Sequence, residues 1–337
     1  MSNLFKKAAV FSDIHFGLRQ NSTSHNIDCI NFIDWYCKTA REHNCDVAIF
    51  MGDWNHHRNS LNVNTLNYSL TAIETLSKNF DRVLFIVGNH DLYYKDKRDI
   101  NSIPFIRNLK NVMLIDKIYT EHDVSLIPWM VADEWKSVKK IKSRYVFGHL
   151  ELPHFMMNAM VAMPDHNELH EDHFINQEHV FSGHFHKRQK RGNITYIGNC
   201  FPHNYADVND NERGMMILEH GGEPQYLAWP GAPKFKIIKL SQLLAEPDKL
   251  LSDNTYARVE IDIDISYEEA NFIKETFMGQ FNLRELSLTQ GKQNEVLDSI
   301  GVDVNFESVD QIVTKQITSI ESEFYDNKLL LDIYNNL

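Results

Sequence analysis

Long hydrophobic runs are missing from this sequence. A helix that crosses a bilayer takes about 20 consecutive apolar residues, and no segment comes near that length. The first residues, MSNLFKKAAVFSDIHFG, are unlike a signal peptide, because the apolar stretch AAVF ends at once at Ser12 and Asp13. We therefore expect no membrane association and a cytoplasmic location. Repeats and low-complexity segments are missing too, and a hydrophobic content of 43% is ample for folded globular domains.

Cysteine is scarce. The four cysteines, Cys29, Cys37, Cys45 and Cys200, form no Cys-x-x-Cys pair. Spacings of that kind mark zinc sites and redox motifs, and disulfides belong to oxidising compartments. We therefore expect reduced thiols that fill core positions, rather than a zinc site or disulfides.

Positive charge is in deficit. The chain has 34 basic and 46 acidic residues, which give a formal net charge of -12. The long-range field of such a chain does not attract the phosphates of nucleic acid. A role on nucleic acid would therefore need local basic patches, bound metal cations or a basic partner. Histidine, by contrast, is abundant, with 17 residues of which several fall in short motifs.

Short apolar runs alternate with helical patterns through the first two-thirds of the sequence. Helices are predicted over residues 24–42 and about 63–78. The apolar face of the first helix is expected to contain Ile27, Ile30, Ile33, Cys37 and Ala40. The runs predicted as strands include AAVFSD, VAIFMGD, RVLFIVGNHD, VSLIPW, RYVFGHL, HVFSGHFH, ITYIGN and GMMILEH. Continuous apolar strands that alternate with helices indicate an α/β fold, with a buried sheet flanked by helices.

A rigid break at WPGAP, residues 229–233, predicts a domain boundary. A first domain is expected over residues 1–230. A small α/β domain is expected over residues 234–292, in which Ser266 and Glu269 have capping-box spacing at the start of a helix. Residues 305–337 carry two apolar stripes at helical spacing, which could pack on the core or dock on a partner helix.

Five polar motifs share one placement, at the end of an apolar strand. They are S-D-I-H at 12–15, G-D at 52–53, G-N-H-D at 88–91, G-H at 148–149 and G-H-F-H at 183–186. Side chains at the carboxyl ends of strands in such a sheet converge on one crevice. Residues that are distant in sequence are therefore expected to form one cluster.

The residue types in these motifs suit divalent metals. Asp provides an anionic oxygen, Asn a neutral oxygen and His an imidazole nitrogen, a mixture that favours Mn²⁺, Fe or Zn²⁺ over Ca²⁺. Asp53 is the carboxylate suited to bridge two ions, and two cations about 3.5–4 Å apart can hold a phosphate and activate water. One Asp-x-His alone would be read as a turn after a strand. The five motifs together indicate a metal site.

In this order the five motifs resemble those of the calcineurin-like metallophosphoesterase superfamily. The resemblance implies a four-layer β-sandwich flanked by helices and two divalent metal ions, Mn²⁺ in first place and Mg²⁺, Fe or Zn²⁺ as alternatives. It implies a first ion held by Asp13, His15 and His186, a second held by Asn89, His149 and His184, and Asp53 as the bridge. It also implies that His90 is a catalytic residue and not a ligand, which protonates the leaving group or stabilises the transition state.

Further residues narrow the resemblance to SbcD-type nuclease subunits of double-strand-break repair and meiotic recombination. His56, three residues after Asp53, matches a histidine of that family and is a second catalytic candidate. IPWM at 127–130, G-H-L-E at 148–151 and I-x-Y-I-G at 194–198 also match. In length and endings the chain is most similar to phage recombination endonuclease subunits, which would place it in a host cytoplasm. The loop 199–207 departs from the family pattern, and its role is open.

The resemblance implies a DNA exonuclease and endonuclease that acts on ends and single strands in recombination, repair or replication. It implies that residues 234–292 form a capping domain and that residues 305–337 bind an SbcC-type coiled-coil ATPase. The expected assembly is a homodimer of this chain within a heterotetramer. A phosphatase or small-molecule phosphodiesterase with the same site is one alternative, and a scaffold that keeps the fold without catalysis is another.

Two segments are candidates for DNA contact, although each could instead be a solvated loop. KRQKR at 187–191 starts one residue past His186, and YYKDKR at 93–98 follows G-N-H-D. The residues expected to contact phosphates or bases are Lys187, Arg188, Lys190, Arg191, Tyr93 and Lys95. Other histidines, His25 and His203 among them, are expected to be ordinary residues of surface helices or loops.

Overall fold

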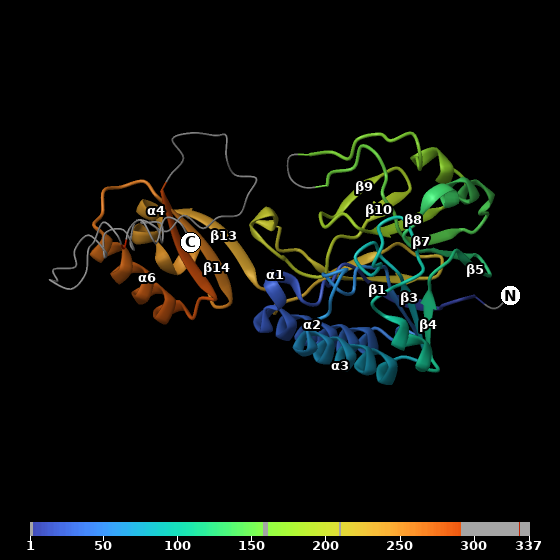
Figure 1. Cartoon of the computed structure of the whole chain (residues 1–337), viewed down its shortest axis with the longest axis horizontal. Helices are drawn as coiled ribbons and strands as arrows, with labels where there is room; N and C mark the ends of the chain where they lie inside the picture. Colours follow the sequence, from blue (N-terminus) through green and yellow to red (C-terminus); the bar gives the residue numbers. More distant parts are fainter. Residues whose placement is uncertain (1–2, 158–160, 209, 291–329, 331–337) are drawn as a thin grey trace. The chain divides into compact units, whose positions relative to one another are not determined.

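A computed structural model of the chain describes residues 3–157, 161–208, 210–290 and residue 330. These residues belong to two compact units, 1–233 and 234–337, which meet in sequence after Pro233 (Figure 1). The helices predicted for residues 305–337 lie outside the described residues, apart from residue 330.

A six-stranded sheet forms one half of the first unit. Its strands lie in the order β12 (Gln225–Ala228), β11 (Gly214–Glu219), β1 (Lys7–Phe11), β2 (Val47–Phe50), β3 (Arg82–Ile86) and β4 (Val112–Ile115). β1 to β4 run parallel, and β11 lies antiparallel beside β1. One of the two neighbours of β1 therefore comes from the far end of the unit's sequence.

A second six-stranded sheet forms the other half. Its strands lie in the order β5 (Tyr119–Glu121), β6 (Val124–Ile127), β7 (Tyr145–His149), β8 (His179–Gly183), β10 (Ile194–Tyr196) and β9 (Gln189–Arg191). The four inner strands run parallel, and the two edge strands run antiparallel to their neighbours. The two edge strands, β5 and β9, were not predicted, because their sequences YTE and QKR lack an apolar pattern.

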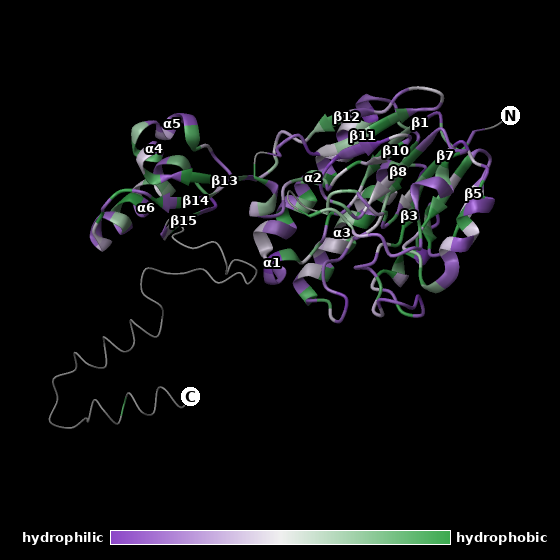
Figure 2. Ribbon diagram, turned by 90° about the horizontal axis from the view of Figure 1, so that it is seen from above, coloured by the Kyte–Doolittle hydropathy of each residue, from purple (hydrophilic) through white to green (hydrophobic). Residues whose placement is uncertain are grey.

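Side chains alternate between the two faces of each strand, and this decides how the layers pack. In β1, Ala8 and Val10 face the second sheet, whereas Ala9 and Phe11 face the helices. The inner row of the first sheet meets Phe147 and other side chains of the second sheet in one buried cluster. This cluster joins the two sheets into a sandwich, and Figure 2 shows hydrophobic stretches on these strands in green.

Helices cover the outer face of the first sheet (Figure 1). They are the short α1 (Leu18–Asn21), α2 (Thr23–Glu42) and α3 (Val63–Asn79), and the two long ones match the predicted helices. The predicted apolar face of α2 was partly wrong, because Ile27 is 40% exposed. The helix instead turns Phe32 and Tyr36 onto Phe11, at ring-centroid distances of 5.6 and 4.6 Å. Aromatic rings bury more apolar area than an isoleucine, so they set the rotation of the helix.

Short 3-10 segments, and not long helices, cover the outer face of the second sheet. They are η2 (Ala132–Lys140) and η3 (Glu171–Phe174), whose Val138 and Phe174 share a buried cluster with Val146 and Val180 of the sheet. Two further segments, η1 (Pro104–Asn108) and η4 (Tyr205–Asp207), lie in connections. The four layers confirm the predicted α/β sandwich fold.

The second unit contains a three-stranded parallel sheet in the order β13 (Lys234–Lys239), β14 (Thr255–Ile261) and β15 (Glu285–Gln290). Its helices are α4 (Leu240–Ala245), α5 (Pro247–Leu250) and α6 (Tyr267–Phe281). The predicted capping box is present at α6: the Ser266 hydroxyl accepts from the Glu269 N–H, and the Glu269 carboxylate accepts from the Ser266 N–H. The apolar faces of helices and strands share one small core.

None of the helices in the described part of the chain is both long and apolar enough to cross a membrane. All four cysteines are free thiols, and Cys29, Cys37 and Cys200 are buried, as expected for core positions.

We predict that Phe147→Ala destabilises the first unit by about 3–5 kcal/mol, because it leaves a cavity between the sheets. Phe147 is fully buried and stacks on Phe181 at 5.4 Å. Urea unfolding followed by tryptophan fluorescence measures the effect, since all five tryptophans lie before residue 230. Val63→Ala, at a position 82% exposed, is the control and should change stability by less than about 0.5 kcal/mol. Equal effects would contradict the assigned packing.

Candidate metal centre

The residues predicted as metal ligands come together at one edge of the sandwich. Each lies at or just after the carboxyl end of a parallel strand: β1, β2 and β3 of the first sheet, and β7 and β8 of the second. Among the predicted ligands, two groups of three side chains have potential ligand atoms within 4.8 Å of one another. The groups are Asp13, His15 and His186, and Asp53, His149 and His184.

Asn89 completes the second group. Its side-chain oxygen Oδ1 lies 2.9 Å from Nε2 of His149 and 3.0 Å from Nδ1 of His184. In the first group, Nε2 of His15 lies 3.2 Å from Nε2 of His186. All seven predicted ligands are therefore in two adjacent clusters.

Asp53 lies between the two groups. Its Oδ2 is 3.6 Å from Nε2 of His15, and its Oδ1 is 3.4 Å from Nε2 of His149. One carboxylate thus presents one oxygen to each group, which is the geometry of a bridging ligand.

The facing atoms explain why a cation fits in the second group. Nδ1 of His149 is 2.7 Å from the Met51 carbonyl oxygen, and since a carbonyl can only accept, this nitrogen carries the proton. In the neutral ring, Nε2 then presents a lone pair to the Asn89 oxygen, which is also an acceptor. Two acceptors at this distance repel unless a proton or a cation lies between them. Oxygens and imidazole nitrogens without a thiolate are a donor set suited to Mn²⁺, Fe or Zn²⁺.

The electrostatics of the buried groups differ from one ring to the next. Burial by itself lowers the pKa of His149, but the Asp53 carboxylate outweighs it and raises the pKa to about 9, so that without a bound cation Nε2 carries the proton that separates it from the Asn89 oxygen. Burial favours protonation of Asp53, yet His149 and His15 hold the pKa of that carboxyl well below its usual value. Burial lowers the pKa of His184 to about 3 and that of His15 well below its usual value. These two rings are therefore neutral, as a metal ligand must be.

Four of the candidate ligands have left-handed backbone conformations. The φ angle is 54° at Asp13, 52° at His15, 63° at Asp53 and 89° at His184. Such a conformation costs a residue with a Cβ on the order of 1–2 kcal/mol. Strain of this kind persists where the surrounding structure enforces it, and it clusters at functional sites. The sharp turns bring ligands from both sheets to the same place.

Gly52 and Gly183 allow the motifs of the two sheets to approach this closely. A Cβ on Gly52, whose φ is 100°, would overlap the imidazole of His149. A Cβ on Gly183 would overlap the hydroxyl of Ser12. The glycines of the G-D and G-H-F-H motifs are thus required by contact between loops of opposite sheets.

Asp91 holds the loop that carries Asp53, a role that sequence analysis missed. Its buried carboxylate accepts hydrogen bonds of 2.9–3.1 Å from the backbone N–H groups of Gly88, Asp53, Trp54 and Asn55. Its position as the fourth residue of G-N-H-D, to which the predicted ligand set assigns no role, was the available signal.

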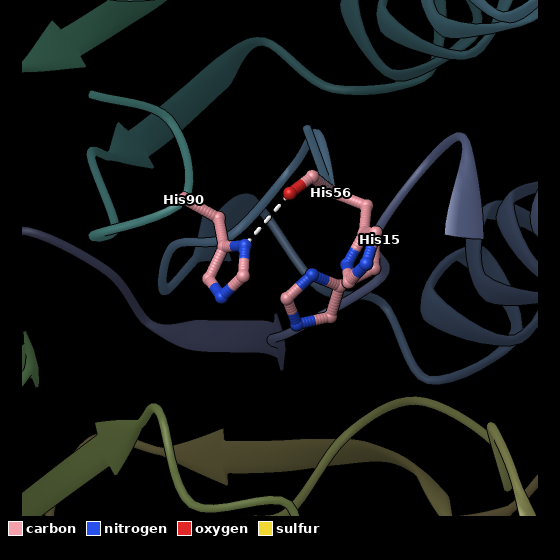
Figure 3. Close-up of side chains that lie close together, drawn as sticks. All are labelled: His15, His56 and His90. Carbon is pink, nitrogen blue, oxygen red and sulfur yellow. Dashed lines mark hydrogen bonds between the residues drawn. The ribbon is translucent and has the colours of Figure 1, made fainter. Parts of the chain in front are cut away.

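His56 and His90 lie beside the first group, and Figure 3 shows their rings together with His15. The His90 and His56 rings stack with centroids 5.3 Å apart. Nδ1 of His90 donates to the His56 carbonyl oxygen at 2.7 Å, the dashed line in Figure 3. Nε2 of His90 is therefore the nitrogen that can serve a substrate. Burial lowers the pKa of His56 to about 4, which keeps its ring neutral.

His25 and His203 are not surface residues, contrary to the prediction. They are 2% and 1% exposed. Nε2 of His25 donates to the His15 carbonyl oxygen at 3.0 Å, and the His203 ring lies 5.3 Å from that of His186. The loop 199–207 covers the first ligand group and is pinned by Arg19, which donates to the His203 carbonyl oxygen. No sequence pattern marked these two residues.

The predicted DNA-contact residues differ in their surroundings. Lys187, Lys190, Tyr93 and Lys95 are exposed. Arg188 instead donates to the carbonyl oxygens of Ile197 and Glu212, and Arg191 forms a 3.1 Å ion pair with Glu171. Arg191 is exposed as well, so Lys187, Lys190 and Arg191 all face solvent, and Arg191 does so while paired with Glu171.

Known proteins resemble this chain in sequence. It is 28% identical to exonuclease subunit 1 of Enterobacteria phage T4 over 216 residues, which cover 61% of this chain and 62% of that protein. The chain thus spans about three-fifths of that relative's length. A solved structure, the Pseudomonas putida nuclease MPE, matches with a TM-score of 0.28 and 20% identity, over 56% of this chain and 66% of that one.

A family model gives the broader placement. The model described as calcineurin-like phosphoesterase matches residues 6–188, which include every candidate ligand from Asp13 to His186. Because this match covers more than half of the 337 residues, the chain belongs to the calcineurin-like phosphoesterase family.

Proposed function

We propose that this phosphoester hydrolase cleaves the phosphodiester bonds of DNA, as an exonuclease and endonuclease on ends and single strands. The observation that carries the proposal is Asp53, whose two oxygens face the two ligand groups at 3.6 and 3.4 Å. DNA as the substrate is supported by the name of the similar phage T4 protein, an exonuclease subunit. The exposed Lys187 and Lys190, directly after His186, support contact with a phosphate backbone.

Members of this family use divalent metal ions, and we propose two of them here, Mn²⁺ in first place. Asp13, His15 and His186 would hold one, Asn89, His149 and His184 the other, and Asp53 both. When bound, such a pair supplies a nucleophile from water and neutralises charge on the phosphate. The chain itself holds these ligands in place. The Met51 carbonyl oxygen orients the His149 ring, and the Asp91 carboxylate accepts a hydrogen bond from the backbone N–H of Asp53.

His90 is the proposed proton donor to the leaving oxygen. Its Nδ1–H is held by the His56 carbonyl oxygen, which leaves Nε2 as the ring nitrogen that would carry the donated proton. After Nε2 gives up its proton, the neutral ring keeps the same orientation. The Asp53 carboxylate accepts from the backbone N–H of His90 at 2.8 Å, which fixes the position of His90 relative to Asp53.

We further propose a partner. Residues 305–337 would bind an SbcC-type coiled-coil ATPase, and residues 234–292 would form a capping domain, in a homodimer within a heterotetramer. The support is the apolar pattern of the tail and its resemblance to the ATPase-binding segment of such subunits. The net charge of -12 gives further support, because a chain this acidic needs a basic patch, bound metal ions or a partner to bind DNA.

The main experiment compares substrates. Purified protein with Mn²⁺ is incubated with single-stranded and linear duplex DNA, and separately with a chromogenic phosphomonoester. We expect degradation of DNA that EDTA abolishes and Mn²⁺ restores. Hydrolysis of the monoester without any cleavage of DNA would favour the alternative of a phosphatase. Lack of bound metal in a titration would favour a scaffold.

We predict that Asp53→Asn abolishes hydrolysis of phosphodiesters, because a neutral amide cannot neutralise two dications at once. Steady-state cleavage of an oligonucleotide measures the loss, and elemental analysis measures the accompanying fall in bound metal. Asp81→Asn, at an exposed position outside the centre, is the matched control and should behave as the wild type. Normal rates in Asp53→Asn would refute the two-metal assignment.

His90→Ala should separate proton transfer from metal binding. We expect it to retain both metal ions and to lose turnover by about 10²–10⁴-fold, the usual contribution of a general acid. Metal content and kcat are measured on the same preparation. If the metal is lost together with activity, His90 is a ligand. That result would support metal binding by the third close group, which His90 forms with His15 and His56.

The double variant Lys187→Ala, Lys190→Ala is predicted to bind single-stranded DNA more weakly. The slope of log K against log salt should fall by about 0.7 for each lysine that contacts a phosphate. Lys139→Ala, Lys140→Ala, an exposed pair at the end of η2, is the matched control. A salt slope unchanged from wild type would remove KRQKR from the DNA interface.

A further inference from the structure

A cavity opens directly beside the second ligand group. His149 forms part of its wall, and so does Trp129, whose ring lies 5.0 Å from that of His184. The space that the centres of water molecules can occupy measures about 100 Å³. Since one water needs roughly 10–15 Å³ of such space, the cavity has room for a group of several heavy atoms.

Two indoles and two carboxylates give the cavity its chemistry. Trp129 and Trp135 are only partly buried, so part of each indole remains open to a ligand. Glu151 and Glu168 are the carboxylates of the wall, and His149 and His166 add imidazoles to it. Carboxylates repel a phosphate, whereas indole faces attract a flat ring and carboxylates accept hydrogen bonds from amino groups. The wall therefore fits an uncharged aromatic ring with N–H donors better than an anion.

The position of the cavity indicates which kind of aromatic ring it could bind. A phosphodiester held at the ligand groups has a base one sugar away on either side, and the cavity begins at His149 and Trp129. Bases of single strands stack on aromatic side chains in proteins that bind them. A base in a duplex would first have to leave its stack.

We propose that this cavity binds one unpaired nucleobase of the strand being cleaved, next to the phosphate at the metal centre. The proposal rests on the proposed action on DNA and adds a subsite to it. Trp129 and Trp135 provide stacking surface, and Glu151 and Glu168 accept from exocyclic amino groups. The subsite makes an unpaired nucleotide a better substrate than a paired one, and the described residues of its wall include neither lysine nor arginine.

Trp135→Ala is the first test, because Trp135 contacts His173 and no candidate ligand. Trp129 is less suitable, since its ring packs on His184 and His149. The manganese-loaded full chain is assayed on a thymidine dinucleotide and on its counterpart with abasic residues in place of both nucleosides. Trp35→Ala, another partly buried tryptophan that lies on α2, is the matched control.

The wild type should prefer the dinucleotide by about 5–150-fold in kcat/KM, the range of one base–aromatic contact. Trp135→Ala should lose most of that preference through KM, Trp135→Phe should recover part of it, and Trp35→Ala should keep it. Manganese content, measured by elemental analysis, should equal that of the wild type in every variant. Unchanged preference in a metal-loaded Trp135→Ala would overturn the base subsite.

A second variant protects the test if Trp135→Ala does not fold. Glu168 is exposed, so Glu168→Gln leaves the packing intact. It should reduce the preference for a cytidine dinucleotide over a thymidine one, because cytosine carries an exocyclic amino group and thymine does not. An unaltered cytidine preference in this variant would count against the subsite. If the wild type hydrolyses a chromogenic monoester and neither dinucleotide, the proposed action on DNA fails and the subsite falls with it.

Discussion

Seven side chains that could bind metal ions converge on one edge of the sandwich, and their lone pairs repel one another wherever no proton or cation lies between them. They are three carboxylate or amide groups and four imidazoles from five loops, and Nε2 of His149 lies only 2.9 Å from the Asn89 oxygen. The scaffold resists this repulsion with buried backbone hydrogen bonds, of which Asp91 accepts four. Left-handed turns and the close contacts of Gly52 and Gly183 follow from the same requirement, since looser loops would let the acceptors separate.

The convergence itself was predictable because strand ends are local features. An apolar run that stops at Asp13 or His149 reveals both the strand and the polar side chain at its end, and parallel strands share the edge at which they end. Helix α2 was predictable by its period, although its rotation was not. The larger rings of Phe32 and Tyr36 displaced Ile27 from the core, a competition that depends on the shape of the sheet beneath them.

What sequence analysis missed depends on contacts between distant residues. In the sequence, nothing distinguishes Asp91 from the other residues of G-N-H-D. Its role is evident only from the four backbone N–H groups of two loops that donate to its carboxylate. His203 has no motif, and its burial against His186 comes from a loop that folds back over the first ligand group. The edge strand β9 lies in the KRQKR run, which was expected to be a DNA-contact segment or a solvated loop and not a strand. Pairing with β10 provides the hydrogen bonds that form the strand although its sequence lacks an apolar pattern. Arg188 likewise donates to a backbone carbonyl oxygen, that of Glu212, a contact that no sequence spacing indicated.

The place of β11 between β12 and β1 has a consequence for biosynthesis. β1 ends at Phe11 and β11 begins at Gly214, so an early strand waits for its antiparallel neighbour until nearly the whole first unit has left the ribosome. At about 5–20 residues per second, that wait is on the order of 10–40 s. The ligand set is not complete before His186 is made. A nascent chain that ends before His186 therefore lacks part of the candidate ligand set, and the site can form only after most of the first unit has been made.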